Sequence, residues 1–591
     1  MHVKNGLSAT KGSPVPPAGE IAQLGIIGVV LLLLLFYGGT MWMSVAISRK
    51  KENADDYMTA GNSIGFGVSA ASMTATWIWA SSMYASVTAG YTYGVSGPIH
   101  YGLWGALMIL FIYPFGKRIR KVAPRAHTLA EVMYARHGCS SQLMLAGSNV
   151  LGSVISLTSN FIAGGAIIAM LSPLSFGAGI LIIAGGVLLY TLWSGFRASV
   201  LTDFTQVMAM LGAAVVIIPA VFFLAGGPSM FAEGVASGNV TPQQESFFSS
   251  DAFMNQGAPY IAAVLAYAIG NQTIAQRLFA VREDLIKPTF VTATVGYGAT
   301  VIGVGMLGVM ALYLGIEPMG GDVNNLMPQM VGTYLPVVLV ALAFVMIIGS
   351  LSSTADSDLA ALSSIVMTDI YGQSVGRRNA DPKLMLLIGR ITMIVATGLA
   401  LYFATARFNI LDLLVFVGAL WGCLVFPVIA SFYWKKVTNT AFTVSVLVAL
   451  AVFLPVRFEL LPLEGAWALL VELLAIVGVG VVLGIMAFGF FGLRAAIVIG
   501  ATATIAVLPF GFGYLRDFET LSGSLVAYSV SFLVCWLLSV RSSQDFDFSV
   551  IKSVTGDFDE ETPTAEDEEP AGHSAHRSGG GDPDDDLLGA R

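Results

Sequence analysis

The sequence predicts an all-α polytopic membrane protein with about 15 (13–15) transmembrane helices, and two observations carry that prediction. Of the 591 residues, 55% are hydrophobic and only 11% are charged, with a mean hydropathy of +0.77. Soluble proteins carry about 25% charged residues. Apolar runs of about 20 residues, the length that crosses the hydrocarbon layer, also recur along nearly the whole chain. A water-soluble protein is therefore excluded.

The apolar runs divide the chain into fifteen candidate spans. The twelfth is short and the fourteenth is interrupted near Pro509, so thirteen or fourteen crossings are alternatives. In chain order the spans are 24–47, 65–93, 97–116, 142–172, 174–192, 200–224, 255–275, 289–314, 333–371, 385–405, 410–434, 441–455, 466–490, 494–511 and 521–540.

The basic residues predict the orientation, because Lys and Arg favour the cytoplasmic side of a membrane. With the N-terminus outside, 24 of the 29 Lys and Arg residues fall in inside loops. One of these inside groups is Arg277, Arg282 and Lys287. The long outside loops 226–254 and 316–332 contain neither residue type. We therefore expect the N-terminus outside and the C-terminus inside.

The acidity of the chain belongs to its C-terminal end. From Ser542 onward there are 14 acidic and 3 basic residues, a net charge of −11, whereas the whole chain carries −8. Residues 541–591 are poor in apolar side chains, and we expect a disordered acidic cytoplasmic tail. Binding of a partner by this tail is an alternative. Nothing in the sequence indicates a nucleic-acid partner; the expected partners are a small-molecule solute and the lipid bilayer.

Four stretches place polar groups where lipid should be. An ionisable side chain at mid-membrane costs about 2.5–3.5 kcal/mol, so each such group calls for a function. Hydroxyl groups next to a carboxylate are hard oxygen ligands, suited to a small cation such as Na⁺. The stretches are Ser72–Ser82, Thr202–Gln206, Tyr267–Thr273 and Ser350–Asp358.

Each polar group also has a plain structural interpretation. Serines such as Ser81, Ser82 and Ser352 often bond back to the carbonyls of their own helix. Asp203 lies near a cytoplasmic end, where it could be solvated or could pair with Arg197. Asp356 is harder to explain in this way, because it lies about one turn from Ser353 inside a hydroxyl cluster. Both interpretations stay open for the serines and for Asp203.

Motifs for soluble-enzyme chemistry are missing. The sequence contains no GxxxxGK[ST], HExxH or GxSxG motif, and its six histidines form no ligand pair. We therefore predict a protein that is not an enzyme and has no catalytic residues.

Motifs in a fixed order give a resemblance to a known family. Asp55–Gly61 (DDYMTAG) is similar to the DYxxAG entry to the core of the solute:sodium symporter family. Gly195–Gln206 is similar to its "G…TDxxQ" signature, and Ser353–Tyr371 to its long helix ending in "D-[IL]-Y". The pair Gln276-Arg277 fits the "QR" pair of the family. The chain resembles this family over roughly residues 40–435.

The resemblance implies a LeuT-type fold, in which two inverted five-helix repeats each begin with a broken helix. Unwound backbone at membrane depth is tolerated where it lines a cavity, and its carbonyls can then bind an ion. The implied organisation is an extra N-terminal helix at 24–47, a first repeat at 65–224, a second at 255–434, additional C-terminal helices at 441–540 and the tail at 541–591.

The resemblance also implies three sets of site residues. Asp356 replaces a hydroxyl usual in the family's second ion site, so that site could carry H⁺ instead of Na⁺. The implied sodium ligands are Ala75, Ile78, Ser350, Ser353 and Thr354. The second ion or proton site would use Asp203, Ser353, Asp356 and Ser357. The expected solute-binding residues are Trp77, Trp79, Ser81, Tyr267, Asn271 and Gln272.

The resemblance implies secondary active transport, with Na⁺ as the coupling ion and H⁺ as the alternative. We predict symport of a small polar solute across the plasma membrane by alternating access, in a bacterial cell. Three stretches look most like the urea-transporting branch, which makes urea the preferred solute: Trp77–Ala80, Tyr93–Pro98 and Ala123–Thr128.

Two other functions are weighed against urea symport. The first is symport of an amino acid or a short carboxylate such as proline or acetate. The membrane core is expected to hold no basic residue, which argues against an anionic substrate. The second is a passive channel or facilitator for a small neutral solute, against which the mid-membrane hydroxyl and carboxylate cluster speaks.

Overall fold

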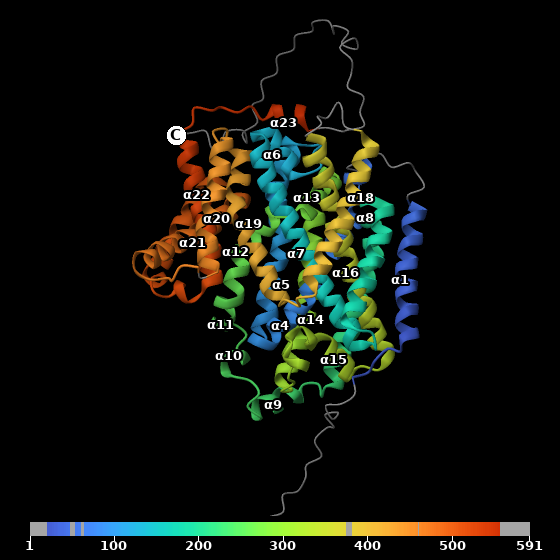
Figure 1. Ribbon diagram of the computed structural model, residues 1–591. Coiled ribbons are helices and arrows are strands. Elements are labelled where there is room, and N and C mark those ends of the chain that lie inside the picture. Colours follow the sequence, from blue (N-terminus) through green and yellow to red (C-terminus); the bar gives the residue numbers. More distant parts are fainter. Residues whose placement is uncertain (1–20, 48–53, 61–63, 374–380, 459, 556–591) are drawn as a thin grey trace, which may run out of the picture.

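A computed structural model describes residues 21–47, 54–60, 64–373, 381–458 and 460–555. Long helices run side by side through the molecule, and short helices gather at its two ends (Figure 1). Within the described residues, the only β-pairing is an isolated bridge between Ile64 and Val281. The prediction of an all-α protein is confirmed.

The helices follow the predicted order of spans. Their bounds are α1 Ile26–Ile47, α2 Ala54–Thr59, α3 Phe66–Trp77, α4 Ala80–Tyr93, α5 Ser96–Val122, α6 Leu129–His137, α7 Cys139–Leu171, α8 Phe176–Leu224, α9 Ser229–Ala236, α10 Pro242–Glu245, α11 Ser250–Ala252, α12 Ala258–Gly270, α13 Gln272–Ala280, α14 Ile286–Tyr313, α15 Leu326–Tyr334, α16 Val337–Ile365, α18 Pro382–Ala404, α19 Ile410–Tyr433, α20 Asn439–Arg457, α21 Gly465–Gly511, α22 Glu519–Val540 and α23 Ser549–Val554.

Twelve segments of the described chain are long and apolar enough to cross a membrane. Two predicted spans are missing from that number because their helices are broken: 65–93 divides into α3 and α4, and 255–275 into α12 and α13. A third difference is α21, which covers two predicted spans and bends at Gly492, where φ is +80°. Counting each broken pair once and dividing α21 would restore fifteen crossings, and that number stays a prediction.

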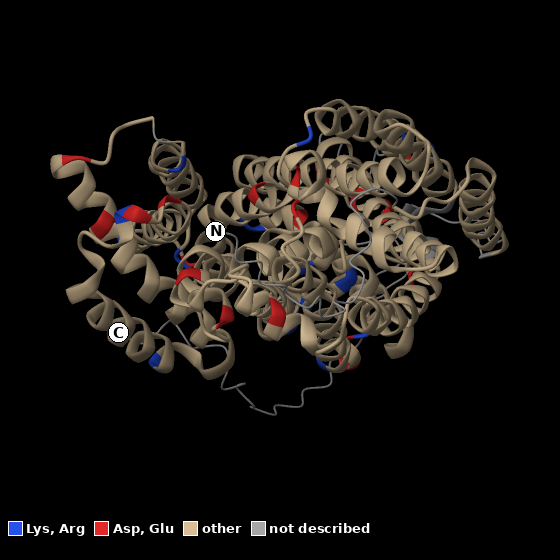
Figure 2. Cartoon of the chain, turned by 90° about the horizontal axis from the view of Figure 1, so that it is seen from below, with Lys and Arg blue, Asp and Glu red and all other residues tan. Residues whose placement is uncertain are grey.

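The first and the last described residues lie at opposite ends of the helices (Figure 1). Ala22 and Leu24, just before α1, donate backbone hydrogen bonds to Gly332 and Leu171 beside α15. In Figure 1, α9, α10, α11 and α15 share that end, whereas α6 and α23 lie at the other. Seen from below, charged residues are sparse among the helices (Figure 2). Which end faces the cytoplasm stays a prediction.

Small residues let α4 and α14 approach closely. A Cβ atom at Gly90 would meet the carbonyl oxygen of Gly305, and a Cβ at Gly308 would meet that of Val87. Glycine at such positions allows two membrane helices to pack backbone against backbone. This crossing holds α4, the second half of the first broken helix, in a fixed place next to the site.

Candidate ion and solute site

The first broken helix exposes backbone carbonyls in the middle of the molecule. α3 ends at Trp77, Ile78 has φ −78° and ψ 76°, and α4 begins at Ala80 after an extended Trp79. The N–H of Trp79 bonds to the carbonyl of Trp77 at 3.0 Å. It is therefore turned away from the carbonyl of Ala75, its usual helical partner. The break leaves oxygen atoms available for other ligands.

Hydroxyl groups of α16 face these carbonyls. The Thr354 Oγ1 donates to the carbonyl oxygen of Thr76 at 3.1 Å, and the Ser350 Oγ donates to that of Ile78. The Ser353 Oγ donates instead to Asp203 Oδ1 on α8. All of these residues are buried. The structure thus brings three of the five expected sodium ligands, Ile78, Ser350 and Thr354, to the contact between the break and α16. Ser353 faces Asp203 on α8, and Ala75 lies three residues before Ile78.

Asp203 is paired with an internal cation. Its Oδ2 lies 3.0 Å from Arg277 Nη2 and accepts from the Ser72 hydroxyl at 2.6 Å. Arg277 is 5% exposed and lies on α13, the second half of the other broken helix. The sequence left solvent and Arg197 open as partners of Asp203, and it did not suggest Arg277, the partner that the structure shows.

The placement of Arg277 corrects two sequence predictions. It does not belong to an inside loop with Arg282 and Lys287, because α13 carries it into the helix bundle. The expectation of a membrane core without a basic residue is therefore wrong. The neighbours of Arg277 in α13 are all buried in the structure: Ile274, Ala275, Leu278 and Phe279.

The two carboxylates of α16, Asp356 and Asp358, accept hydrogen bonds from hydroxyl groups. Asp356 accepts hydrogen bonds from Ser199 Oγ at 2.7 Å, Tyr190 OH at 2.9 Å and Ser357 Oγ at 3.2 Å. Asp358 accepts from Ser156 Oγ at 2.5 Å. Both carboxylates are buried. Asp203, Ser353, Asp356 and Ser357, expected to form a second ion site, do lie together.

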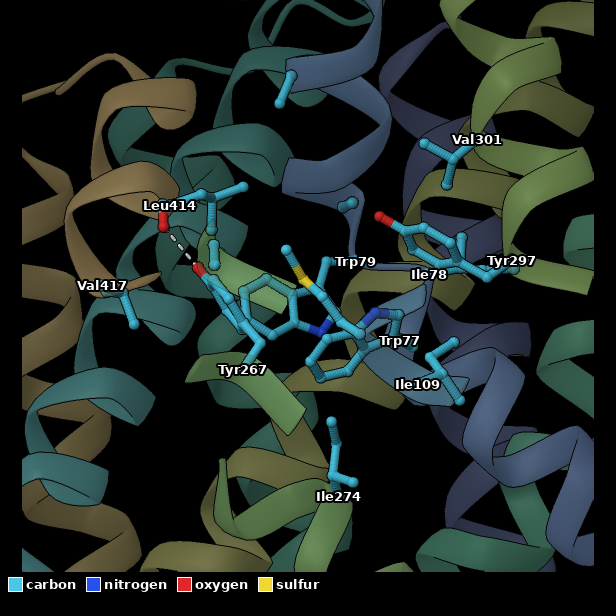
Figure 3. Close-up of a cluster of buried hydrophobic side chains, with 14 of the residues drawn as sticks. Trp77, Ile78, Trp79, Ile109, Tyr267, Ile274, Tyr297, Val301, Leu414 and Val417 are labelled. Carbon is cyan, nitrogen blue, oxygen red and sulfur yellow. Dashed lines mark hydrogen bonds between the residues drawn. The ribbon is translucent and has the colours of Figure 1, made fainter. Parts of the chain in front are cut away.

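Aromatic rings cover the break. The ring centroids of Trp77 and Trp79 lie 5.6 Å apart, and each lies about 6 Å from the ring of Tyr267 on α12, at 5.9 and 6.2 Å. Figure 3 shows the three rings turned toward one another. The hydroxyl of Tyr267 donates to the carbonyl of Leu414 on α19 at 2.6 Å (Figure 3), which fixes the ring over the cavity.

The rings line a small cavity. Its volume is about 20 Å³, and it therefore has room for about one water molecule. Trp77, Trp79 and Tyr267 were predicted to bind solute. The other lining residues were not: Ser82, Tyr101, Gly105, Met108, Tyr260, Tyr297 and Leu414. Three of these are tyrosines within predicted spans, which the sequence analysis did not single out.

Two predicted solute-binding residues carry buried polar atoms without a partner. Among the described residues, neither Trp79 Nε1 nor Ser81 Oγ has a hydrogen-bond partner. The matching atom of Trp77, in contrast, donates to the carbonyl of Gly105 at 3.1 Å. Burying an unpaired donor costs about 1–3 kcal/mol, so such an atom indicates a ligand or another reason. Only Trp79 of this pair lines the cavity.

Asn271 and Gln272 are used within the protein. Asn271 Oδ1 accepts from the backbone N–H of Thr273 at 2.8 Å and so caps α13. The Gln272 amide donates to the carbonyl of His127 at 3.1 Å and accepts from the N–H of Leu129 at 3.3 Å. Gln272 thereby ties α13 to the segment before α6. Their assignment to solute binding stays a prediction.

Two halved helices, a row of α16 hydroxyls and a small aromatic cavity beside the break are features of secondary active transporters. A model described as the sodium:solute symporter family matches residues 57–448. The chain belongs to that family.

Relatives point to symport of small solutes. The chain is 25% identical over 465 residues to probable urea active transporter 1 of Schizosaccharomyces pombe, covering 72% of this chain and 68% of that protein. It is 27% identical to the urea-proton symporter DUR3 of Oryza sativa over 36% of this chain and 30% of that one. It is 25% identical to the high-affinity proline transporter PutP of Bacillus subtilis over 66% and 84%.

The fold is of the LeuT type. The chain superposes on a Na⁺-coupled sialic acid symporter with a TM-score of 0.63 at 18% identity, covering 81% of this chain and 97% of the other. The prediction of a multi-pass membrane symporter that is not an enzyme is confirmed. The expected bacterial origin is not supported, since the urea transporters named above come from a fungus and a plant.

Proposed function

We propose that the protein couples the movement of urea across a plasma membrane to Na⁺ by alternating access. The observation that carries this proposal is that one short stretch, residues 76–79, contributes to both the proposed ion site and the solute cavity. The carbonyls of Thr76 and Ile78 face the α16 hydroxyls, while the rings of Trp77 and Trp79 cover the solute cavity. An ion at the carbonyls and a solute at the rings would therefore each fix the conformation of the same four residues.

The cavity chemistry suits urea. Urea is flat and neutral, so it can stack against indole and phenol rings without an ionic partner. Its carbonyl oxygen would accept the unused Trp79 Nε1–H, which removes the cost of that buried donor. Its amide hydrogens would reach the hydroxyls of Ser82 and the lining tyrosines. The present cavity holds only about 20 Å³, and rotation of the rings around the break would enlarge it.

The ligands at the break suit Na⁺. Backbone carbonyls and hydroxyls are hard, neutral oxygen donors, as a small monovalent cation prefers. Ala75, Ile78, Ser350, Ser353 and Thr354 would supply five of them, from α3 and α16. Binding there would stiffen the break, so that the solute cavity forms more readily when Na⁺ is present.

Arg277 does not favour an anionic solute such as acetate, in spite of its position. Its nitrogens are taken by Asp203, Ser72, Ser357 and the carbonyl of Thr273. An incoming carboxylate would have to displace one of these partners. The guanidinium therefore neutralises an internal carboxylate and leaves the solute cavity without a free charge.

Proline symport is the second candidate, favoured by one observation. α4 begins at Ala80 without a side-chain cap, beside the cavity residue Trp79. The uncapped N–H groups of a helix start can hold a carboxylate. The amino group of a zwitterion would still need an acceptor among the hydroxyls, since no carboxylate is among the residues that line the cavity.

Uptake into liposomes separates these candidates. The protein is reconstituted and labelled urea, proline or acetate is supplied with an inward Na⁺ gradient, an inward H⁺ gradient, or neither. We expect concentrative urea uptake driven by Na⁺. Uptake driven only by H⁺ would show that H⁺, and not Na⁺, is the coupling ion. Uptake of proline but not of urea would show that proline is the solute. Equilibration of urea without either gradient would indicate a passive facilitator and overturn the proposal.

A further inference from the structure

The expected second ion site already contains a positive charge. Four residues were to hold that ion, and two of them, Asp203 and Ser357, contact the same nitrogen of Arg277. Nη2 lies 3.0 Å from Asp203 Oδ2 and 2.7 Å from Ser357 Oγ. A cation shared between these two oxygens would have to occupy the place of this nitrogen.

The guanidinium is held from several directions. Nε donates to Ser72 Oγ on α3 at 3.0 Å, and Nη1 donates to the carbonyl of Thr273 in its own helix at 3.3 Å. The guanidinium carbon also lies 5.4 Å from the ring centre of Phe196. These contacts fix the plane of the group, and Arg277 is only 5% exposed. It is thus a permanent part of this site and not a surface side chain that visits it.

The carboxylate has little room for another cation. Asp203 Oδ2 accepts from Arg277 and Ser72, while Oδ1 accepts from Ser353. A guanidinium is weakly hydrated and has a planar set of donors, so it is suited to a buried ion pair such as Arg277 with Asp203. A metal ion beside it would meet a like charge in a medium of low dielectric constant.

We propose that Arg277 acts as a tethered cation that replaces the second metal ion, so that the chain binds one Na⁺ and not two. This inference rests on the proposed function for the identity of the first ion. Arg277 would also orient that first site indirectly, because it holds Asp203 in place. Asp203 in turn accepts a hydrogen bond from the hydroxyl of Ser353, one of the proposed sodium ligands. It is a positioning residue and touches neither the solute nor the first ion.

Binding of radioactive Na⁺ to the purified full-length protein tests the proposal. The wild type should bind one Na⁺ per chain. Arg277→Met should bind a second, and the double variant Arg277→Met/Asp203→Asn should lose that second ion again. Arg277→Lys keeps a cation and should bind one. Arg282→Ala is the matched control, because Arg282 pairs with Asp284 at the surface.

A thermal-shift measurement gives an independent readout. Millimolar guanidinium ion should raise the melting temperature of Arg277→Ala and leave that of the wild type unchanged, because only the variant has a vacant position for it. A second Na⁺ in the wild type that Asp203→Asn removes would overturn the proposal, even if no Arg277 variant can be purified. Equal Na⁺ binding by Arg277→Met and the wild type would also overturn it.

The same data keep the two proposals apart. Absence of any Na⁺ binding to the wild type, or binding that Thr354→Ala does not weaken, would overturn Na⁺ coupling at the first site. The inference about Arg277 is judged separately, by whether its replacement creates a cation site that depends on Asp203.

Discussion

Trp77 and Trp79 are two residues apart, yet they differ in what their indole N–H groups do. The first is satisfied by the carbonyl of Gly105, whereas the second has no partner among the described residues. Because the break turns the backbone between them, both rings face Tyr267 although a regular helix would separate them. We therefore expect Trp79, and not Trp77, to offer its indole N–H to the solute, although both rings line the cavity.

We predict that Trp79→Phe weakens solute binding and leaves the fold intact. The change removes one hydrogen-bond donor and keeps an aromatic ring. A lost bond of about 1 kcal/mol corresponds to a rise in KM of about fivefold. Concentration-dependent uptake into liposomes measures it. Trp77→Phe is the control and should reduce thermal stability instead. An unchanged KM for Trp79→Phe would show that the indole N–H of Trp79 does not bind the solute.

The α16 hydroxyls give the second residue-scale prediction. Ser353→Ala with Thr354→Ala removes two of the five proposed ligands and should abolish Na⁺-driven uptake, while the protein remains folded in the membrane. Uptake at imposed Na⁺ gradients measures the effect. Ser363→Ala, on the same helix, is the matched control because its hydroxyl donates to the sulfur of Met367 and to none of the proposed ligands in the described chain. Uptake unchanged in the double variant would contradict the site.

At the scale of elements, α13 is fastened along its whole length. Gln272 binds the segment before α6, and Gln276 Nε2 donates to the carbonyl of Met58 at 2.7 Å and to Ser364 Oγ at 3.0 Å. Arg277 adds the contacts with α3, α8 and α16. Because several side chains bind α13 to its neighbours, we expect this half-helix to move as a rigid body when those hydrogen bonds break and new ones form.

The segment after α22 is fastened to α6 as well. The guanidinium of Arg136 lies 3.8 Å from the ring centre of Phe546 and donates to the carbonyl of Lys435 at 3.0 Å. Burial lowers the pKa of Arg136 to about 10, so it stays charged at neutral pH. Ile551 of α23 is also fully buried. Residues 541–555 therefore belong to the folded protein, although the sequence assigned them to the tail.

We predict that Phe546→Ala lowers thermal stability by loosening this contact. An arginine over an aromatic ring contributes about 0.5–2 kcal/mol, depending on its desolvation. The melting temperature of the purified protein measures the change. Val550→Ala is the control in the same segment, since Val550 is 42% exposed. A melting temperature equal to that of the wild type would show that the segment adds no stability.

At the scale of the whole molecule, the net negative charge lies in the C-terminal residues 556–591, outside the part of the chain that matches the symporter family. Residues 556–591 contain 12 acidic and 2 basic residues, a net charge of −10, against −8 for the entire chain. The family match, residues 57–448, ends more than 100 residues before this stretch. The transport core therefore carries a small net positive charge, as expected for a membrane protein held by basic inside loops.

Deletion of residues 556–591 should leave transport unchanged, because no residue of the site or of the α6 contact is removed. Uptake by the shortened protein, normalised to the amount in the membrane, measures this. Deletion from residue 545 is the comparison, and it should lower stability through the loss of Phe546 and Ile551. Loss of uptake in the shorter deletion would show that the tail takes part in transport.

The hydroxyl and carboxylate positions could be predicted because polar groups in an apolar run are visible in the sequence. Asp203, Asp356 and the α16 serines stood out for this reason. Arg277 could not be recognised, since it follows a polar stretch next to Arg282 and Lys287 and has the sequence context of a loop. The lining residues Tyr101 and Tyr297 were missed because a lone tyrosine in a span is usual in membrane helices.

The sequence by itself determined the membrane class, the helical fold and the polar stretches, because apolar length and the cost of burying charge are properties of local composition. Only the tertiary structure decided the partners. Asp203 could have met water, Arg197 or an ion, and the fold brings Arg277 from 74 residues away. A hydrogen bond between residues far apart in the sequence depends on how the helices pack, and local composition does not determine which distant residues come into contact.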